Sequence, residues 1–243
     1  LSTNDTVGTA LSAFSVAFEG EGNKTGGQGW NEAEQLFGTW LTQYNSEYGY
    51  YDLFLISVKG DVVYSAAKES DLGQNLVDGN LRTSPLGKCF GNAISTVSLQ
   101  DFEPYAPSNG DPSAFVGAPV QKEGKTIGVV ALQLPLDQIN KIMQERSGLG
   151  KTGETYLVGS DKLMRSDSFL DPTGHSVKAS FGGNVAKNGC DTEAARNAIS
   201  GKTGADVVLD YNGSPVLSAF APLDIKGLHW TILAEIDVAE AFC

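Results

Sequence analysis

The stretch LFLISVKGDVVYS, residues 53–65, decides the fold. Two apolar runs rich in β-branched residues flank the turn Lys59-Gly60-Asp61, which is the pattern of a β-hairpin. Residues 155–166, TYLVGSDKLMRS, repeat this order of strand, turn and strand. Phe54 and Tyr156 occupy the same place in the two stretches and are 102 residues apart. The chain therefore contains two copies of one hairpin pattern.

A second pair of hairpin patterns has almost the same offset. Residues 114–132 and 218–234 each contain two longer apolar strands around a turn, and Pro119 and Pro222 are 103 residues apart. Two independent pairs with nearly equal offsets indicate a tandem duplication of one antiparallel module. Two copies are too few for a solenoid, which needs three or more repeats.

Helical spacing of apolar residues predicts helices over 7–17, 31–48, 136–146 and 191–200, the second one capped by Asn31. The segment between the first two hairpins is less regular, with short helical pieces at 72–76 and 85–94.

We predict an α+β fold of two antiparallel sheets with flanking helices, sharing a long N-terminal helical element. In this division residues 1–50 form the N-terminal helices, residues 51–146 the first module and residues 147–243 the second.

Composition and charge exclude several classes of protein. The 17 basic and 29 acidic residues give a net charge of −12, and no cluster of Lys or Arg is present. A nucleic-acid partner or an anionic membrane surface is therefore not expected. The cysteines lie far apart, the only histidines are His175 and His229, and neither HExxH nor CxxC occurs. We predict no metal site and no cofactor. Buried free thiols at Cys89 and Cys190 are favoured over a disulfide.

The sequence contains no motif that indicates an enzyme. Residues 148–153 match GxGxxG, but this loop precedes a strand instead of following one and opening a helix, so a dinucleotide site is not expected. No GxSxG elbow occurs, and both histidines stand in loop-like contexts. No secretory signal peptide and no apolar run long enough to span a membrane is present.

Four segments that follow the N-terminal helices carry a resemblance. They are FEPYAPSNGDPSAFVGAPV (102–120), GKTIGVVALQLPL (124–136), GKTGETYLVGSDKLMRSDS (150–168) and LHWTILAEID (228–237). In this order they resemble the double Cache sensor domain, a tandem of PAS-like modules, of bacterial chemoreceptors and membrane histidine kinases. The resemblance covers the chain from about residue 31 to residue 242.

The resemblance implies the extracytoplasmic sensor domain of a transmembrane signalling receptor, periplasmic or extracellular, anchored in the inner membrane. A small molecule would bind in the membrane-distal module, residues 51–146, and a conformational change would cross the membrane in a homodimeric receptor. The start without Met, inside a helical pattern, fits a segment of a longer receptor. A free-standing periplasmic binding or adhesion module is the alternative.

The amino-acid sensors of this family share an Arg-x-Trp pair, a later Tyr and an Asp in the last strand. Tyr105 stands at the place of the later Tyr. Counting back reaches Gly87-Lys88-Cys89, and counting forward reaches Gln133, so the Arg, the Trp and the Asp are missing. Because a desolvated ammonium needs a carboxylate, we expect that the ligand is not a common α-amino acid recognised by the usual motif.

Four candidate ligand contacts lie between the two hairpins of the first module. Lys88 and Arg82 are lone cations that can anchor a carboxylate, or they are solvated surface residues. Tyr105 and Phe102 flank Glu103-Pro104, where they supply stacking area to a pocket or belong to the core.

Three further candidates lie on the strands of the first module. Gln133 is polar within an apolar strand and needs a partner, which is either the ligand or solvent on the other face of the sheet. Tyr64 and Phe115 either line the pocket or pack in the core.

Overall fold

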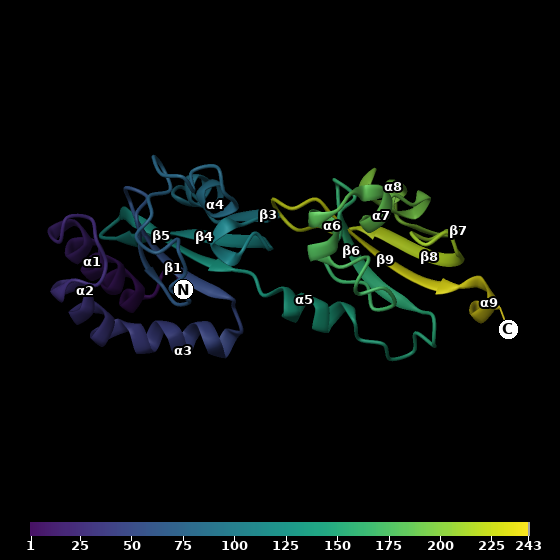
Figure 1. Ribbon diagram of the computed structural model, residues 1–243, viewed down its shortest axis with the longest axis horizontal. Coiled ribbons are helices and arrows are strands. Elements are labelled where there is room, and N and C mark those ends of the chain that lie inside the picture. Colours follow the sequence, from purple (N-terminus) through teal and green to yellow (C-terminus); the bar gives the residue numbers. More distant parts are fainter. Residues whose placement is uncertain (243) are drawn as a thin grey trace. The chain divides into compact units, whose positions relative to one another are not determined.

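The computed structural model describes residues 1–242, and Cys243 lies outside the described residues. The chain divides into two compact units: unit 1 comprises residues 1–135, and unit 2 begins at Leu136. Each unit contains one antiparallel sheet with helices packed on it (Figure 1). The predicted α+β class with two antiparallel modules is confirmed.

The elements of unit 1 are, in chain order, α1 (Asp5–Gly20), α2 (Gln28–Ala33), the π-helical turn η1 (Glu34–Gly38), α3 (Thr39–Tyr48), β1 (Asp52–Ser57), β2 (Val62–Ser65), α4 (Pro85–Ala93), β3 (Ser98–Pro104), the 3₁₀ turn η2 (Ala106–Ser108), β4 (Pro112–Lys122) and β5 (Lys125–Gln133).

Those of unit 2 are α5 (Leu136–Met143), β6 (Glu154–Gly159), α6 (Val177–Gly182), α7 (Val185–Asn188), α8 (Glu193–Ile199), β7 (Gly204–Leu209), β8 (Pro215–Pro222), β9 (Trp230–Asp237) and α9 (Val238–Ala241).

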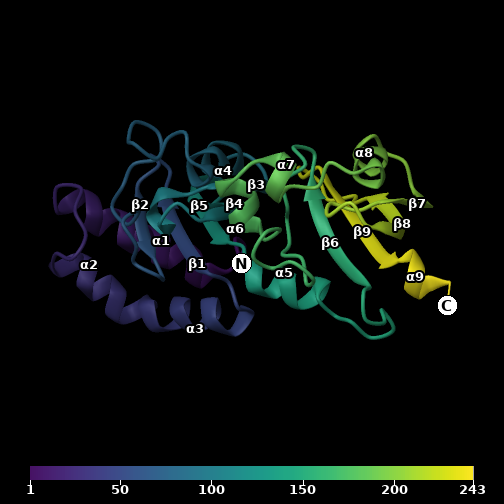
Figure 2. The same ribbon diagram turned by 45° about the vertical axis from the view of Figure 1, so that its right-hand side comes forward.

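The sheet of unit 1 has the strand order β2-β1-β5-β4-β3 and is buried on both faces. Successive residues of a strand point to opposite faces. Leu53 and Leu55 of β1 accordingly join the core beneath α1 and α3, and Phe54 and Ile56 join the core beneath α4. Both views show the sheet between these two groups of helices (Figures 1 and 2). Continuous apolar runs in β1 and β5 follow from this double burial.

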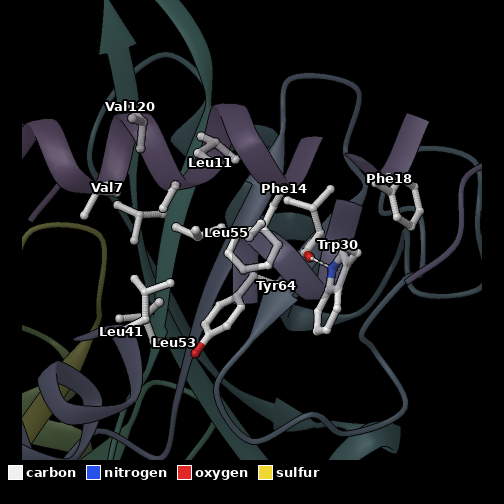
Figure 3. Close-up of a cluster of buried hydrophobic side chains, with 14 residues drawn as sticks. Val7, Leu11, Phe14, Phe18, Trp30, Leu41, Leu53, Leu55, Tyr64 and Val120 are labelled. Atoms are coloured by element: carbon white, nitrogen blue, oxygen red, sulfur yellow. Dashed lines mark hydrogen bonds between the residues drawn. The ribbon is translucent and has the colours of Figure 1, made fainter. Parts of the chain in front are cut away.

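An aromatic cluster fixes the N-terminal helices to unit 1 (Figure 3). The ring of Phe14 lies 5.5 Å from that of Trp30 and 5.1 Å from that of Tyr64. Trp30 Nε1 donates a hydrogen bond of 2.8 Å to the carbonyl of Val63 on β2. The cluster therefore combines burial of large rings with a satisfied indole N–H.

The sheet of unit 2 has the order β6-β9-β8-β7. Helix α8 packs on β7, β8 and β9 through Ala194, Ala195 and Ala198, all fully buried. These methyl side chains allow the helix axis to lie close to the sheet. Helices α6 and α7 gather on the same side of the sheet (Figures 1 and 2).

The predicted hairpin at residues 155–166 is wrong in its second arm. The turn forms, but Met164 makes only an isolated bridge with Val158, and no strand follows. The backbone N–H of Leu157 donates to the Ser166 side-chain oxygen at 2.9 Å, and such side-chain acceptors compete with a strand ladder. The edge strands β3 and β7 were not predicted, because their residues lack a clear apolar alternation.

The predicted helix over 31–48 begins earlier, at Gln28. The Glu21 carboxylate accepts a hydrogen bond from the backbone N–H of Gly29 at 2.6 Å. Glu21 thus pairs one of the first free N–H groups of the helix, a role that the sequence analysis had given to an N-cap at Asn31. The helix ends, as expected, at Gly49, whose φ is 70°.

Helix α5 belongs with unit 2, whereas the sequence-based division placed it in the first module. The Thr155 side chain donates to the carbonyl of Met143, and Asn140 donates to Asp167 at 2.8 Å. These contacts tie α5 to β6 and the loop after it, so the contact boundary falls at Pro135. Helices α1, α2 and α3 all fall within unit 1.

We expect Gly128→Ala to destabilise the protein by about 3 kcal/mol or more. Gly128 has a φ of 156°, and a Cβ there would lie 2.2 Å from the backbone oxygen of Ile56 on β1. Urea unfolding measures the change. The control is Gly91→Ala on α4, whose Cβ meets no atom within 4 Å, and which should gain up to about 1 kcal/mol from helix propensity. Equal stability of the two variants would contradict the close approach of β1 and β5.

Candidate ligand-binding site

Unit 1 carries polar side chains at one end of the sheet face beneath α4. Asp52 of β1 and Phe115 of β4 are both direct cross-strand partners of Gln133 on β5, so all three side chains point to the same face. The next residues along this face, Phe54 and Ala131, belong to the apolar core. The polar end therefore continues a buried hydrophobic surface.

The Asp52 carboxylate organises the loop that follows β2. Its Oδ2 accepts from the Ser65 hydroxyl at 2.7 Å, and its Oδ1 accepts from the backbone N–H of Ala67 at 2.9 Å and of Leu53 at 2.6 Å. Asp52 is fully buried. This loop leads directly to two more acidic residues, Glu69 and Asp71.

Asp71 brings a second buried carboxylate to the site. The Tyr105 hydroxyl donates to Asp71 Oδ2 at 2.8 Å, and both side chains are fully buried. The Tyr105 ring stands edge-on to Phe115 at 5.1 Å. Tyr105 thus joins the polar end to the apolar core.

Gln133 completes the cluster through two hydroxyls. Its side-chain nitrogen donates to Ser113 at 3.0 Å and to Ser108 at 3.3 Å. Ser108 in turn donates to Glu69 at 2.9 Å, and Glu69 also accepts from Tyr51 at 2.8 Å. The loop after β3 is held to the loop after β2 by this chain of contacts.

Two acceptors of the cluster accept no hydrogen bond of normal geometry from the described residues, although the backbone N–H groups of Asp71 and Leu72 help to lower the pKa of the Asp71 carboxyl. Asp71 Oδ1 and Gln133 Oε1 are both buried, and no group of residues 1–242 makes a hydrogen bond of normal geometry to either. A buried acceptor without a donor costs about 1–3 kcal/mol, and buried polar groups are otherwise nearly always paired. The arrangement therefore suits a ligand that donates hydrogen bonds to these two oxygens.

Electrostatics favour the same kind of guest. Burial raises the pKa of Asp52 to about 6 and that of Asp71 to about 6, although hydrogen bonds from Ser65 and Tyr105 oppose the rise. The hydrogen bonds of the cluster involve no Lys or Arg. A positively charged donor would offset both the desolvation and the unpaired acceptors.

A metal ion is a weaker fit to the described residues. Among residues 1–242, no group of three or more His, Cys, Asp or Glu side chains is arranged to hold one. Cys89 and Cys190 are buried free thiols, as the sequence predicted.

The structure brings together three of the seven candidates, Tyr105, Phe115 and Gln133. Tyr64 lies on the opposite face of the sheet, in the cluster with Phe14 and Trp30 (Figure 3), because its cross-strand partner Leu55 points there.

The other three candidates make no contact with this cluster in the bonds described above. Arg82 is exposed before α4. Lys88 is exposed on α4 and forms an ion pair with Glu103. Phe102 is buried on β3.

The sequence interpretation missed Asp52, Glu69, Asp71 and the serines of the cluster. Asp52 precedes an apolar strand directly, which was a usable signal. Glu69 and Asp71 stand in an irregular segment without periodicity, so no pattern pointed to their burial.

Residues 5–242 match the Cache domain family, and the chain belongs to that family. The expected resemblance to double Cache sensor domains is confirmed. Among the helices of residues 1–242, none combines the length and hydropathy needed to cross a bilayer.

Solved structures with the same fold are sensor domains of receptors. The sensor domain of the V. cholerae histidine kinase DctB is 14% identical, with a TM-score of 0.62, over 96% of this chain and 84% of that one. The ligand-binding domain of the Pseudomonas fluorescens chemoreceptor CtaA, in complex with L-leucine, is 16% identical, with a TM-score of 0.54, over 98% of this chain and 86% of that one.

A third structure is the ligand-binding domain of the Pseudomonas aeruginosa amino-acid chemoreceptor PctB in complex with L-Arg. It is 17% identical, with a TM-score of 0.54, over 88% of this chain and 90% of that one. At these identities the similarity establishes the fold.

These complexes overturn the expectation that the ligand is not a common α-amino acid. Domains of this fold hold L-leucine and L-Arg. The expectation required a carboxylate at position 133, whereas Asp71, 34 residues before Tyr105, brings a buried carboxylate to the same cluster. A missing residue in a motif does not exclude its chemistry when another segment supplies it.

We expect the stability of the unliganded protein to fall as the pH rises from about 4 to about 6. The folded-state pKa of Asp52 and of Asp71 lies above the unfolded value, so the folded state binds more protons in this window. Each group then contributes a loss of about 3 kcal/mol. Urea unfolding across this range measures the fall.

In Asp71→Asn the fall should be smaller by about 3 kcal/mol, because the contribution of Asp71 is removed while the amide oxygen still accepts from Tyr105. The exposed Asp78→Asn serves as the control. The same pH dependence in all three proteins would show that these carboxylates are not buried as described.

Proposed function

We propose that this chain is the extracytoplasmic ligand-binding domain of a transmembrane signalling receptor. The polar end of unit 1 binds a small molecule with an ammonium group, amino acids included. The observation that carries the proposal is the pair of buried acceptors without donors, Asp71 Oδ1 and Gln133 Oε1. An ammonium has three donors and a charge that the buried carboxylates compensate.

The apolar neighbours of the cluster supply the rest of the binding surface. Phe115 and Phe54 continue from Gln133 along the same sheet face, and they suit the hydrocarbon part of a small amine or amino acid. Because Asp71 and Gln133 are buried, the ligand enters when residues 105–111, which carry Tyr105 and Ser108, move aside.

The chain connects this site to unit 2 over a very short distance in sequence. Gln133 ends β5, and only Leu134 and Pro135 separate it from α5. A ligand shifts a two-state equilibrium only by its difference in affinity for the two states. A ligand contact at the end of β5 can shift the conformational equilibrium of the segment that begins unit 2. In the proposed membrane-anchored homodimer, that shift carries the signal.

Isothermal titration of the protein with L-leucine, L-serine, L-arginine, γ-aminobutyrate and simple amines tests the ligand class. We expect at least one ammonium compound to bind, and its des-amino analogue, such as 4-methylpentanoate for L-leucine, to bind at least tenfold more weakly. Asp71→Asn should weaken binding by about 10- to 100-fold, as expected for a lost charge-assisted hydrogen bond.

Lys88→Ala serves as the matched control, because Lys88 pairs with Glu103 at the surface and should bind as the unaltered protein does. Tight binding of a carboxylate without an ammonium group, unaffected by Asp71→Asn, would contradict the assignment of the site.

If the chain is part of a transmembrane receptor, the gene must also encode membrane-spanning segments. We expect an apolar run of about 20 residues on each side of the segment that encodes this chain. Sequencing the gene checks this directly. Absence of both runs would favour the alternative of a free-standing periplasmic binding module, and would leave the ligand proposal for unit 1 intact.

A further inference from the structure

Unit 2 repeats the polar end of unit 1 with different residues. Glu154 and Glu235 follow Asp52 and Gln133 by 102 residues each, and they are direct cross-strand partners on β6 and β9. Their exposed fractions are 3% and 5%. The Ser168 hydroxyl donates to Glu154 at 2.8 Å, as that of Ser65 does to Asp52. The duplication has preserved a buried acidic position at the start of each module.

The two units differ in how their acceptors are satisfied. Glu235 accepts from the hydroxyls of Tyr156 at 2.7 Å and Ser218 at 2.8 Å. Glu154 Oε2 accepts from Ser168 and from the backbone N–H of Phe169 at 2.9 Å. Its other oxygen accepts from the hydroxyl of Tyr211. All four carboxylate oxygens therefore have donors within the protein, whereas the polar cluster at the end of the unit 1 sheet leaves Asp71 Oδ1 and Gln133 Oε1 open.

Tyr211 is a donor that reaches this cluster from a turn of unit 2. It stands in the tight turn between β7 and β8. Asp210 braces that turn by accepting from the backbone N–H groups of Asn212 and Ser214, both at 2.8 Å. The turn is thus held in a form that directs its aromatic residue inward.

The Tyr211 ring is contacted on several sides, as a bound aromatic ligand would be. It stacks on His175 with ring centroids 4.0 Å apart, and Tyr156 stands edge-on to it at 5.5 Å. Its hydroxyl is also 2.7 Å from that of Ser168. Stacking, an edge contact and two polar partners fix both the plane and the polar end of the ring.

Tyr211 also lines a groove of about 530 Å³. Its lining includes Tyr211 itself, Thr192 at the N-cap of α8, Arg196 in the last turn of that helix, and Asn212 of the turn between β7 and β8. This volume is in the range of small-molecule sites. Removal of the Tyr211 ring would therefore connect the buried cluster around Glu154 with this solvent-accessible groove.

The geometry points to Tyr211 as a built-in occupant of a ligand-type pocket in unit 2. The pocket, formed by Glu154, Ser168, His175 and Tyr156, takes a small phenol when the Tyr211 ring is absent. In the native chain the turn fills it, so this pocket takes up no outside ligand while the turn is in place. The inference concerns unit 2 alone and does not depend on the function proposed for unit 1.

Tyr211→Gly tests the inference with 4-methylphenol, which is the tyrosine side chain cut at Cβ. We expect the variant to lose roughly 10 °C in melting temperature, and millimolar 4-methylphenol to restore at least half of this loss. Toluene, which lacks the hydroxyl for Glu154 and Ser168, should restore much less. Titration calorimetry should show one phenol bound per variant chain and none to the native protein.

Leu209→Gly is the control, since Leu209 lines the same groove but is exposed, and neither compound should stabilise it. If Tyr211→Gly does not fold alone, it is refolded with and without 4-methylphenol, and folded protein should be recovered only with the phenol. Equal recovery, no recovery with the phenol, or equal rescue by toluene would each overturn the inference.

Discussion

A buried carboxylate at the first residue of the first strand is the constraint on which each unit depends. Asp52 accepts from the hydroxyl of Ser65 at the end of β2 and from the backbone N–H of Ala67 in the loop after it. Glu154 accepts from the Ser168 hydroxyl and from the backbone N–H groups of Phe169 and Leu170 in the corresponding loop of unit 2. A carboxylate is buried only when donors surround it. The loop must therefore fold back onto the strand, and this fold-back sets where the following polar residues lie.

The same constraint leads to different chemistry in the two units because the residues around it differ. Unit 1 has Phe54, Phe115 and Gln133 where unit 2 has Tyr156, Ser218 and Glu235. In unit 2 the added hydroxyls donate to the added carboxylate, and the cluster is closed. In unit 1 the apolar replacements supply no donor, so acceptors remain open. Both units thus keep the buried carboxylate at the start of the first strand, but only unit 2 supplies hydrogen-bond donors to every acceptor of its cluster.

Local pattern made much of the fold predictable, and the site much less so. The first hairpin, the pair of long strands in each module and the duplication were predictable because apolar runs bounded by turn residues mark buried strands, but the second arm of the hairpin at 155–166 forms no strand. Strands β3 and β7 were not, since edge strands need little apolar alternation. Tyr105 was found from the resemblance to the family's motif, and Gln133 as a polar residue within an apolar strand. Asp71 was missed because its burial depends on a long-range contact with Tyr105, and Lys88 pairs with Glu103 through a contact that no local pattern records.

A buried, incompletely satisfied carboxylate also gives a physical basis for switching. A conformation that admits water to Asp71 would relieve the desolvation that penalises its charged form. The proposed ammonium ligand would instead favour the closed form, in which it supplies charge and hydrogen-bond donors. The two conformations then differ in affinity for the ligand, which is the condition for any ligand-driven shift. Only Leu134 and Pro135 separate Gln133 from unit 2, so the strand that would contact the proposed ligand is also the one that leads out of unit 1.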